Sequence, residues 1–278
     1  QSTCNATVRV EDNTAPTAIC QDITIQLDAN GSASITEPDI DNGSSDACGV
    51  ASLSLDNTSF GCSDIGGNTV VLTVTDVNGN QSNCNATVTV EDNTPPEITC
   101  PPAQTRSVDA NCQYVIEDFS ALGSAVDNCG GEVTLGQVTT PGTVLDGPGG
   151  FFITLRALDE NGNTSTCEFP VIFNDDTPPA ITCPDTQIEL GNINCEASLG
   201  DYTGLATVND NCDAAPVVTQ SVPSGTNFSN STSVTLTATD EAGNADSCTF
   251  TVEADAPPVI TCPPAQTRSV DANCQYVI

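Results

Sequence analysis

The chain has 278 residues, of which 37 are Asp or Glu against 4 Lys or Arg and no His, so its formal net charge is −33. That charge repels DNA, RNA and anionic lipid, so we expect no nucleic-acid binding. No run of about 18 apolar residues occurs, so we expect no membrane insertion. Aromatic residues make up only 4%, so any core is small, and the 15 cysteines predict disulfides that cross-link an extracellular or cell-surface protein.

The sequence repeats itself along its whole length. An acidic residue, one or two prolines and a cysteine open four similar segments, which run from Asp12 to Cys20, from Asp92 to Cys100, from Asp175 to Cys183 and from Asp255 to Cys262. Cys4-Asn-Ala-Thr-Val also matches Cys84-Asn-Ala-Thr-Val. These matches predict that residues 1–11 are the last strand of a preceding repeat, that 12–91, 92–174 and 175–254 are full repeats, and that 255–278 start a fourth.

Within each repeat the apolar residues follow the two-residue period of a half-buried strand. Val70, Leu72 and Val74 alternate in repeat 1, and Ile153 and Leu155 alternate in repeat 2. Asn-Gly at 78–79 and 161–162, and a weaker Ala-Gly at 242–243, predict tight hairpin turns. About seven short strands in about 80 residues is typical of an immunoglobulin-type β-sandwich. The sequence therefore predicts an all-β fold of tandem, disulfide-stapled, immunoglobulin-like repeats in an elongated array.

The ordered series of motifs resembles the hyalin repeat (HYR). The likeness is carried by the Asp-x-Thr-Pro-Pro-x-Ile-Thr-Cys openings, by Asp-Asn-Cys at 127–129 and 210–212, and by the Thr-Ala-Thr-Asp-x-x-Gly-Asn stretch before Cys248. The first repeat departs, because it lacks the second cysteine and has Cys62 instead. It resembles repeats of giant Bacteroidota surface adhesins exported by the type IX route. The resemblance implies an immunoglobulin-like sandwich, an extracellular adhesive or filament-forming role, and no catalysis.

Each full repeat holds four cysteines, which allow three pairings. The first and last cysteines share the parity of core residues, and first and last strands commonly lie side by side in this fold. We therefore expect the bonds Cys20–Cys84, Cys100–Cys167 and Cys183–Cys248. As a consequence, the remaining cysteines would pair as Cys48–Cys62, Cys112–Cys129 and Cys195–Cys212. A zinc–thiolate cluster is disfavoured, because the chain has neither a Cys-x-x-Cys pair nor His.

Acidic residues recur at three places in every full repeat: the entry linker, the Asp-x-Cys loop and the hairpin before the last strand. An immunoglobulin-like sandwich brings these places to one end, where carboxylates repel one another unless a cation is bound. Alternate oxygen side chains around a Gly turn are also how calcium-binding loops begin. The predicted ligands of calcium are Asp12, Asp46, Asp76, Asn78, Asn80, Asp92, Asp127, Asp159, Asn161, Asn163, Asp175, Asp210, Asp240 and Asn244.

The structural alternative for these acids is that they cap turns and stay solvated. The calcium hypothesis is also based on a resemblance to cadherins, in which acidic linker residues and loops bind calcium between successive domains. If calcium is bound in this way, it stiffens the joints between repeats and acts as a structural cofactor.

The sequence lacks the residue types that nucleophilic catalysis needs, because no His or Lys is present to activate a Ser or Thr nucleophile. We predict no catalytic residues and no enzymatic activity. Two functions remain: a structural stalk or filament segment of a secreted or cell-surface adhesin, or repeats that themselves bind a glycan or protein ligand. Uniform acidity and scarce aromatics favour the stalk. The expected partners are neighbouring repeats of the same long chain, with identical chains in a fibre as a further partner.

Overall fold

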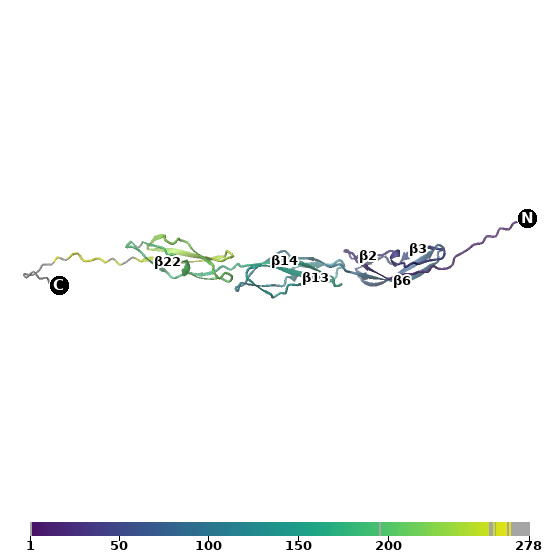
Figure 1. Cartoon of the computed structure of the whole chain (residues 1–278), viewed down its shortest axis with the longest axis horizontal. Coiled ribbons are helices and arrows are strands. Elements are labelled where there is room, and N and C mark those ends of the chain that lie inside the picture. The colour runs from purple at the N-terminus through teal and green to yellow at the C-terminus, as the bar shows by residue number, and fades with distance from the viewer. Residues whose placement is uncertain (1, 195, 256–257, 259, 266, 268–278) are drawn as a thin grey trace, which may run out of the picture. The chain divides into compact units, whose positions relative to one another are not determined.

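The computed structural model describes residues 2–194, 196–255, 258, 260–265 and 267. Figure 1 shows the whole chain coloured by residue number, and backbone contacts divide this chain into two compact units. Unit 1 comprises residues 1–104, 115–143 and 150–171, and unit 2 comprises residues 105–114, 144–149 and 172–278. Repeat 1 therefore lies in unit 1 with one part of repeat 2, and repeat 3 lies in unit 2 with the other part. Most of the predicted fourth repeat, 255–278, lies outside the described residues.

Repeat 1 is built of short strands and two helical turns. In chain order these are β1 (Ile23–Gln26), β2 (Ser32–Ser34), α1 (Glu37–Ile40), β3 (Val50–Leu55), β4 (Ser59–Gly61), the 3-10 turn η1 (Cys62–Asp64), β5 (Gly66–Asp76) and β6 (Gln81–Glu91). One sheet has the order β1-β6-β5-β3, and β2 pairs with β4. β5 is antiparallel to β3 and β6, whereas β1 runs parallel to β6. Among the described residues no helix is long and apolar enough to cross a membrane.

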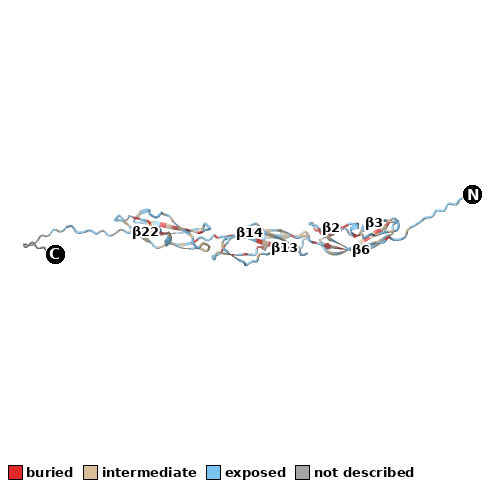
Figure 2. Ribbon diagram, in the orientation of Figure 1, coloured by how far each residue is buried: buried red, intermediate tan, exposed pale blue. Residues whose placement is uncertain are grey.

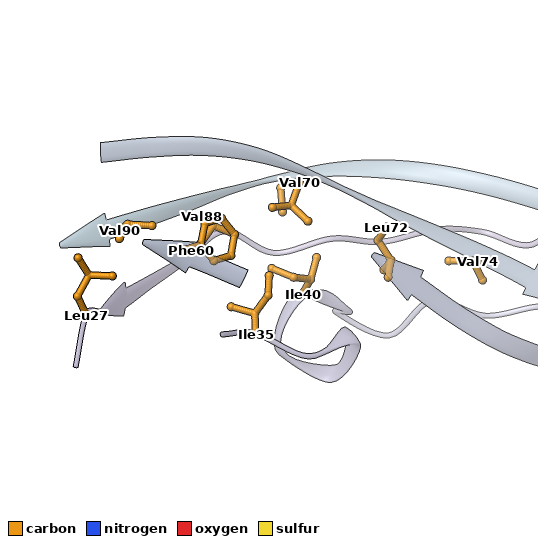
Figure 3. Close-up of a cluster of buried hydrophobic side chains, with 10 residues drawn as sticks. Leu27, Ile35, Ile40, Phe60, Val70, Leu72, Val74, Val88 and Val90 are labelled. Carbon is orange, nitrogen blue, oxygen red and sulfur yellow. The ribbon is translucent and has the colours of Figure 1, made fainter. Parts of the chain in front are cut away.

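The core of repeat 1 is formed by alternate residues of β5 and β6 that pack against the short elements. Figure 3 shows Ile35, Ile40 and Phe60 facing the valines of these two strands. The buried members are Leu27, Ile35, Ile40, Phe60, Val70, Leu72, Val74, Ala86, Val88 and Val90. The two-residue period predicted for this repeat is confirmed, since every second residue from Val70 to Val74 is buried.

Repeat 2 has eight strands and no α-helix. They are β7 (Glu97–Thr99), β8 (Gln104–Ser107), β9 (Gln113–Val115), β10 (Ser124–Val126), β11 (Thr134–Gln137), β12 (Val144–Asp146), β13 (Gly149–Leu158) and β14 (Thr164–Asn174), with the 3-10 turn η2 (Ser120–Leu122). The sheets have the orders β11-β13-β14-β8, β7-β10 and β9-β12. In unit 1 the rings of Phe119 and Phe169 meet edge to face, 5.7 Å apart, a favourable geometry for an aromatic pair.

Repeat 3 follows the same plan. Its elements are β15 (Ala180–Thr182), β16 (Gln187–Leu190), β17 (Glu196–Ser198), the 3-10 turn η3 (Thr203–Leu205), β18 (Thr207–Asn209), β19 (Val217–Gln220), β20 (Asn227–Ser229), β21 (Ser231–Thr239) and β22 (Ala245–Asp255). The large sheet has the order β16-β22-β21-β19, with β16 parallel to β22. Its core includes Val234, Leu236 and Val252 around the edge-to-face pair of Tyr202 and Phe250. In Figure 2 the buried residues of the repeats lie mainly on their strands.

The predicted hairpin turns are all present. Gly79, Gly162 and Gly243 have φ of +94°, +94° and +95°, a left-handed backbone that glycine adopts without steric cost. The weaker Ala-Gly signal of repeat 3 therefore gives the same turn as the two Asn-Gly signals. The three disulfides predicted between the ends of a repeat, Cys20–Cys84, Cys100–Cys167 and Cys183–Cys248, are also confirmed. The chain is an all-β protein of immunoglobulin-like sandwiches.

These small cores predict a clear contrast between two leucines of repeat 3. Leu236 is completely buried in β21, whereas Leu190 in the edge strand β16 is 87% exposed. We expect Leu236→Ala to lower the free energy of unfolding by about 2–5 kcal/mol, because it removes buried methyl groups and leaves a cavity. Leu190→Ala is the matched control and should stay within about 0.5 kcal/mol of the parent. Urea unfolding measures both, and equal losses would contradict this description of the core.

Candidate metal centres and inter-repeat disulfides

Two disulfides join consecutive repeats and overturn the second set of predicted pairs. Cys62 of repeat 1 is bonded to Cys129 of repeat 2 in unit 1, with Cα atoms 5.2 Å apart. Cys112 of repeat 2 is bonded to Cys212 of repeat 3 in unit 2, with Cα atoms 4.9 Å apart. The predictions Cys48–Cys62, Cys112–Cys129 and Cys195–Cys212 are therefore wrong, and Cys195 itself lies outside the described residues. Cys62 and Cys112 stand at different places in their repeats, but each is bonded to the Asp-Asn-Cys loop of the next repeat.

The reason is the end of the repeat at which each cysteine lies. The loop of Cys48 contacts the hairpin that follows β5, since the N–H of Val77 donates to the carbonyl oxygen of Gly49 at 3.1 Å. Cys62 lies just before β5, against Gly31. The 11 residues of β5 separate the two places by about 35 Å. A disulfide needs Cα atoms within about 7 Å, so these two cysteines cannot bond.

The acid at the start of each hairpin holds its own turn. In repeat 2, Asp159 Oδ1 accepts the backbone N–H groups of Asn161 at 2.9 Å and Asn163 at 2.7 Å. Asp159 Oδ2 accepts the side-chain N–H of Asn163 at 2.8 Å, and the same nitrogen donates to the carbonyl oxygen of Asp92 at 3.0 Å. The Asn163 amide thus fastens the hairpin to the entry linker. The equivalent bonds are made by Asn80 to Asp76 and Asp12, and by Asn244 to Asp240 and Asp175.

The side chains of these hairpin acids are buried. Asp76, Asp159 and Asp240 are each less than a tenth exposed. Burial raises the pKa of Asp76, but hydrogen bonds from Asn80, Asn78 and Gly79 outweigh it and hold that pKa below its ordinary value. Asp76 is therefore ionised at neutral pH, at the end of the repeat where the other acids lie.

The Asp-Asn-Cys loops carry oxygen atoms that lack a hydrogen-bond donor. Asp127 Oδ2 accepts the N–H of Cys129 at 2.9 Å, but its Oδ1 is buried without a donor among the described residues. The side chain of Asn128 donates to the carbonyl oxygen of Asp28 in repeat 1 at 3.1 Å, and its Oδ1 is likewise buried without a donor. Asp92 Oδ2, from the entry linker, is a third such atom. Three unpartnered acceptors thus occur where repeat 2 follows repeat 1.

The start of repeat 3 reproduces this arrangement in unit 2. Asp210 Oδ2 accepts the N–H of Cys212 at 2.8 Å, and Asn211 donates to the carbonyl oxygen of Asp109 at 3.1 Å. Asp210 Oδ1 and Asn211 Oδ1 are both buried without a donor in the described part of the chain. Asp175, Asp210 and Asp240, the complete predicted triad, each place one carboxylate oxygen within 4.8 Å of the others.

The other two predicted triads assemble only in part. Asp92 and Asp127 come within the same 4.8 Å limit, as do Asp12 and Asp46, but in each group the third member is the loop cysteine instead of the hairpin Asp159 or Asp76. Cys129 is disulfide-bonded, so it offers no thiolate. The predicted ligands Asn78, Asn80, Asn161, Asn163 and Asn244 belong to the hairpin turns, where their N–H groups bond the hairpin acids.

The donor set suits a hard divalent cation. The unpartnered atoms of Asp92, Asp127, Asn128, Asp210 and Asn211 are carboxylate or amide oxygens, which calcium prefers. Among the described residues the salt bridge found is Arg9 to Glu11, outside all three sites. Sequence reasoning missed Asn128 and Asn211, although the recurrence of Asp-Asn-Cys at 127–129 and 210–212 was a signal for both.

The hairpin clamp gives a second test with a neighbouring control. Asn163→Ala removes the side-chain donor to both Asp159 and Asp92, and leaves a buried carboxylate oxygen short of a bond. We expect it to cost about 1–3 kcal/mol in urea unfolding. Asn161→Ala keeps the backbone N–H that bonds Asp159 and should be nearly neutral. Equal effects of the two substitutions would argue against a clamp.

Residues 174–254 match the family model described as the HYR domain. The chain is 33% identical over 224 residues to hyalin of Strongylocentrotus purpuratus, covering 75% of this chain and 18% of that protein. It is 31% identical over 213 residues to hyalin of Lytechinus variegatus, covering 71% of this chain and 39% of that protein. The chain thus spans well under half the length of these curated relatives.

Among solved structures, domains EC22-24 of mouse cadherin-23 cover 88% of this chain and 100% of their own, at 12% identity and a TM-score of 0.38. That likeness is too weak to bear on the candidate sites. The five disulfides indicate a protein that resides outside the reducing cytosol, extracellularly or at the cell surface. The HYR match over residues 174–254 and the two hyalin alignments show that the chain is similar to hyalin-repeat proteins.

Proposed function

We propose that the chain is a structural segment of an extracellular adhesive array, in which successive repeats are joined by a disulfide and calcium is bound at the entry end of the later repeat. The observation that carries the proposal is the set of buried oxygen atoms without a donor beside each inter-repeat disulfide. The finer assignment, to surface adhesins of the type IX-exported kind, is supported by the departing cysteine pattern of the first repeat.

The energetics favour a cation over empty burial. Each buried acceptor left without a donor costs about 1–3 kcal/mol, and a charged one costs more. Calcium takes six to eight oxygen ligands and removes this penalty together with the repulsion between carboxylates. Asp92, Asp127 and Asn128 would hold the ion between repeats 1 and 2. Asp175, Asp210, Asp240 and Asn211 would hold the ion between repeats 2 and 3.

The second site lies beside an open acidic depression of about 550 Å³. Its lining residues are Pro148, Asn174, Asp175, Asp176, Cys212, Asp213, Glu241, Ala242 and Asn244. The negative field of such a depression attracts cations, and Asp175 belongs both to its lining and to the triad. A hydrated ion would therefore have a route to the ligands.

A stalk function follows from where the ties act. The disulfide and the Asn128 amide bond to Asp28 connect the end of one repeat to the entry of the next, and the proposed ion would hold the entry linker and the loop of the later repeat together. A joint held at several points resists bending. Millimolar extracellular calcium would keep such sites loaded even at the modest affinities of extracellular modules. The proposal assigns the repeats a mechanical role without catalysis.

The test is thermal unfolding of the oxidised whole chain in millimolar calcium or in chelator, with Asp210→Asn as the variant. Calcium should raise the melting temperature of the parent by several degrees, because the ion binds only the folded state. Asp210→Asn should reduce this rise, since it weakens the triad that contains Asp175 and Asp240. Metal analysis of the dialysed chain should find bound calcium in the parent.

Two controls separate binding from simple screening of the net charge. Glu253→Gln makes the same charge change near the other end of β22 from Asn244 and should keep the full rise. Sodium chloride at matched ionic strength should not reproduce the rise. Equal melting temperatures in calcium and chelator, with no bound metal, would refute the calcium sites.

One observation favours ligand binding as a second function. Phe152 on β13 is 62% exposed, and its neighbour Phe151 is also exposed, so repeat 2 presents two adjacent aromatic side chains. Exposed aromatics are enriched where proteins bind partners. If this pair binds a glycan or protein, Phe152→Ser should abolish adhesion to cells or matrix without shifting the melting temperature. Unchanged adhesion would leave the stalk as the function of repeat 2.

A further inference from the structure

Cys48 occupies the position that is disulfide-bonded in the next two repeats. Its N–H donates to Asp46 Oδ2 at 2.7 Å, as Cys129 and Cys212 donate to Asp127 and Asp210 at 2.9 and 2.8 Å. Its sulfur lies within 4.8 Å of carboxylate oxygens of Asp12 and Asp46, the same relation that Cys129 has to Asp92 and Asp127. Yet Cys48 is exposed and unbonded, whereas its two counterparts are bonded to the preceding repeat.

The entry end of repeat 1 is also less covered than that of the others. Asp92 and Asp175 are buried, but their counterpart Asp12 is only half-buried. Ala47 stands where Asn128 and Asn211 donate to the preceding repeat, so no amide clamp can form here. A covalent bond would therefore be the main tie at this end.

Residues 4–11 have the sequence of a final strand but no core to join. Cys4-Asn-Ala-Thr-Val repeats the start of the buried part of β6 at Cys84. Val88 and Val90 of β6 are buried, whereas the matching Val8 and Val10 are 83% and 90% exposed. Residues 2–11 form no strand in the structure. Two valines at strand spacing, in a stretch that matches β6 from Cys84 onward, are typical of the final strand of a repeat of this kind.

We infer that a repeat ending in residues 4–11 docks on the entry end of repeat 1, formed by Asp12, Asp46 and Cys48, and is disulfide-bonded to it through Cys48. The partner is a sandwich of the same kind, with a cysteine at the far end where repeat 1 has Cys62 and repeat 2 has Cys112. The inference rests on the array of the proposed function but not on calcium, so the two can fail separately.

The bond would form by oxidation of two thiols. Either cysteine can start the exchange; written for the partner cysteine, its thiolate is the nucleophile. That thiolate attacks a small-molecule disulfide, such as oxidised glutathione, and releases one reduced thiol. Cys48, on losing its proton, then attacks the mixed disulfide and releases the second reduced thiol. The products are one protein disulfide and two small thiols.

The first experiment maps disulfides in the protein isolated from its source without reductant. Free thiols are alkylated under denaturing conditions before proteolysis and mass spectrometry. The expected result is a Cys48 peptide linked to a peptide of a preceding repeat, alongside the Cys62–Cys129 and Cys112–Cys212 links. Alkylated Cys48 beside protected Cys129 and Cys212 would overturn the inference, as would a link from Cys48 to Cys4.

The second experiment builds the missing neighbour from the chain itself, with residues 92–174 placed directly ahead of Asp12. The upstream copy of Cys112 should bond Cys48. In that fusion Cys48→Ser should raise the number of free thiols by one, because it releases the upstream Cys112. The matched control Cys262→Ser, at an exposed unbonded cysteine, should lower it by one. The proposed bond would be refuted if Cys48→Ser instead lowered the number of free thiols by one. This count is valid only in molecules in which the downstream Cys129, the one bonded to Cys62, is protected from alkylation.

Discussion

Covalent bonds between neighbouring repeats hold buried negative charge together, and the other features of each junction depend on them. In repeat 2 three consecutive residues share the work: Asp127 shapes the loop, Asn128 bonds the carbonyl oxygen of Asp28, and Cys129 carries the disulfide to Cys62. Without the disulfide, repulsion in a chain of net charge −33 would favour separation of these loops. The disulfide keeps this loop of repeat 2 against the end of repeat 1.

Within a repeat the hydrophobic core is small, and the disulfide supplies stability that the core lacks. The buried cluster of repeat 3 includes the aromatic pair of Tyr202 and Phe250 and otherwise consists of aliphatic side chains such as Leu199 and Val234. Cys183–Cys248 closes a loop of 65 residues, which in the chain-entropy model stabilises the folded state by about 4 kcal/mol. Such a bond is a large share of the stability of a small domain. The cysteines are therefore as much a part of the architecture as the valines of β21 and β22.

Local pattern predicted the fold well and the connections between repeats poorly. The parity of Cys20 and Cys84 with core residues was enough to pair them, because parity reports which face of a strand a side chain occupies. Parity says nothing about which end of a sandwich a loop cysteine reaches, so Cys48 and Cys62 were wrongly joined across the length of β5. The acids of repeat 3 were grouped correctly, since the fold brings Asp175, Asp210 and Asp240 to one end. The sequence did not predict that Asn128 and Asn211 bond the preceding repeat, because each bond depends on a carbonyl oxygen far away in the sequence.

The overlap of the disulfide loops has a mechanical consequence. The loops 20–84, 62–129, 100–167, 112–212 and 183–248 overlap in series, so no residue between Cys20 and Cys248 lies outside a loop. Under tension the shortest covalent path crosses Cys20–Cys84, Cys100–Cys167 and Cys183–Cys248, and only the segments 84–100 and 167–183 can lengthen. The other two bonds bridge those same segments. If a protease cuts the backbone in one of these segments, the bridging disulfide still links the two fragments covalently.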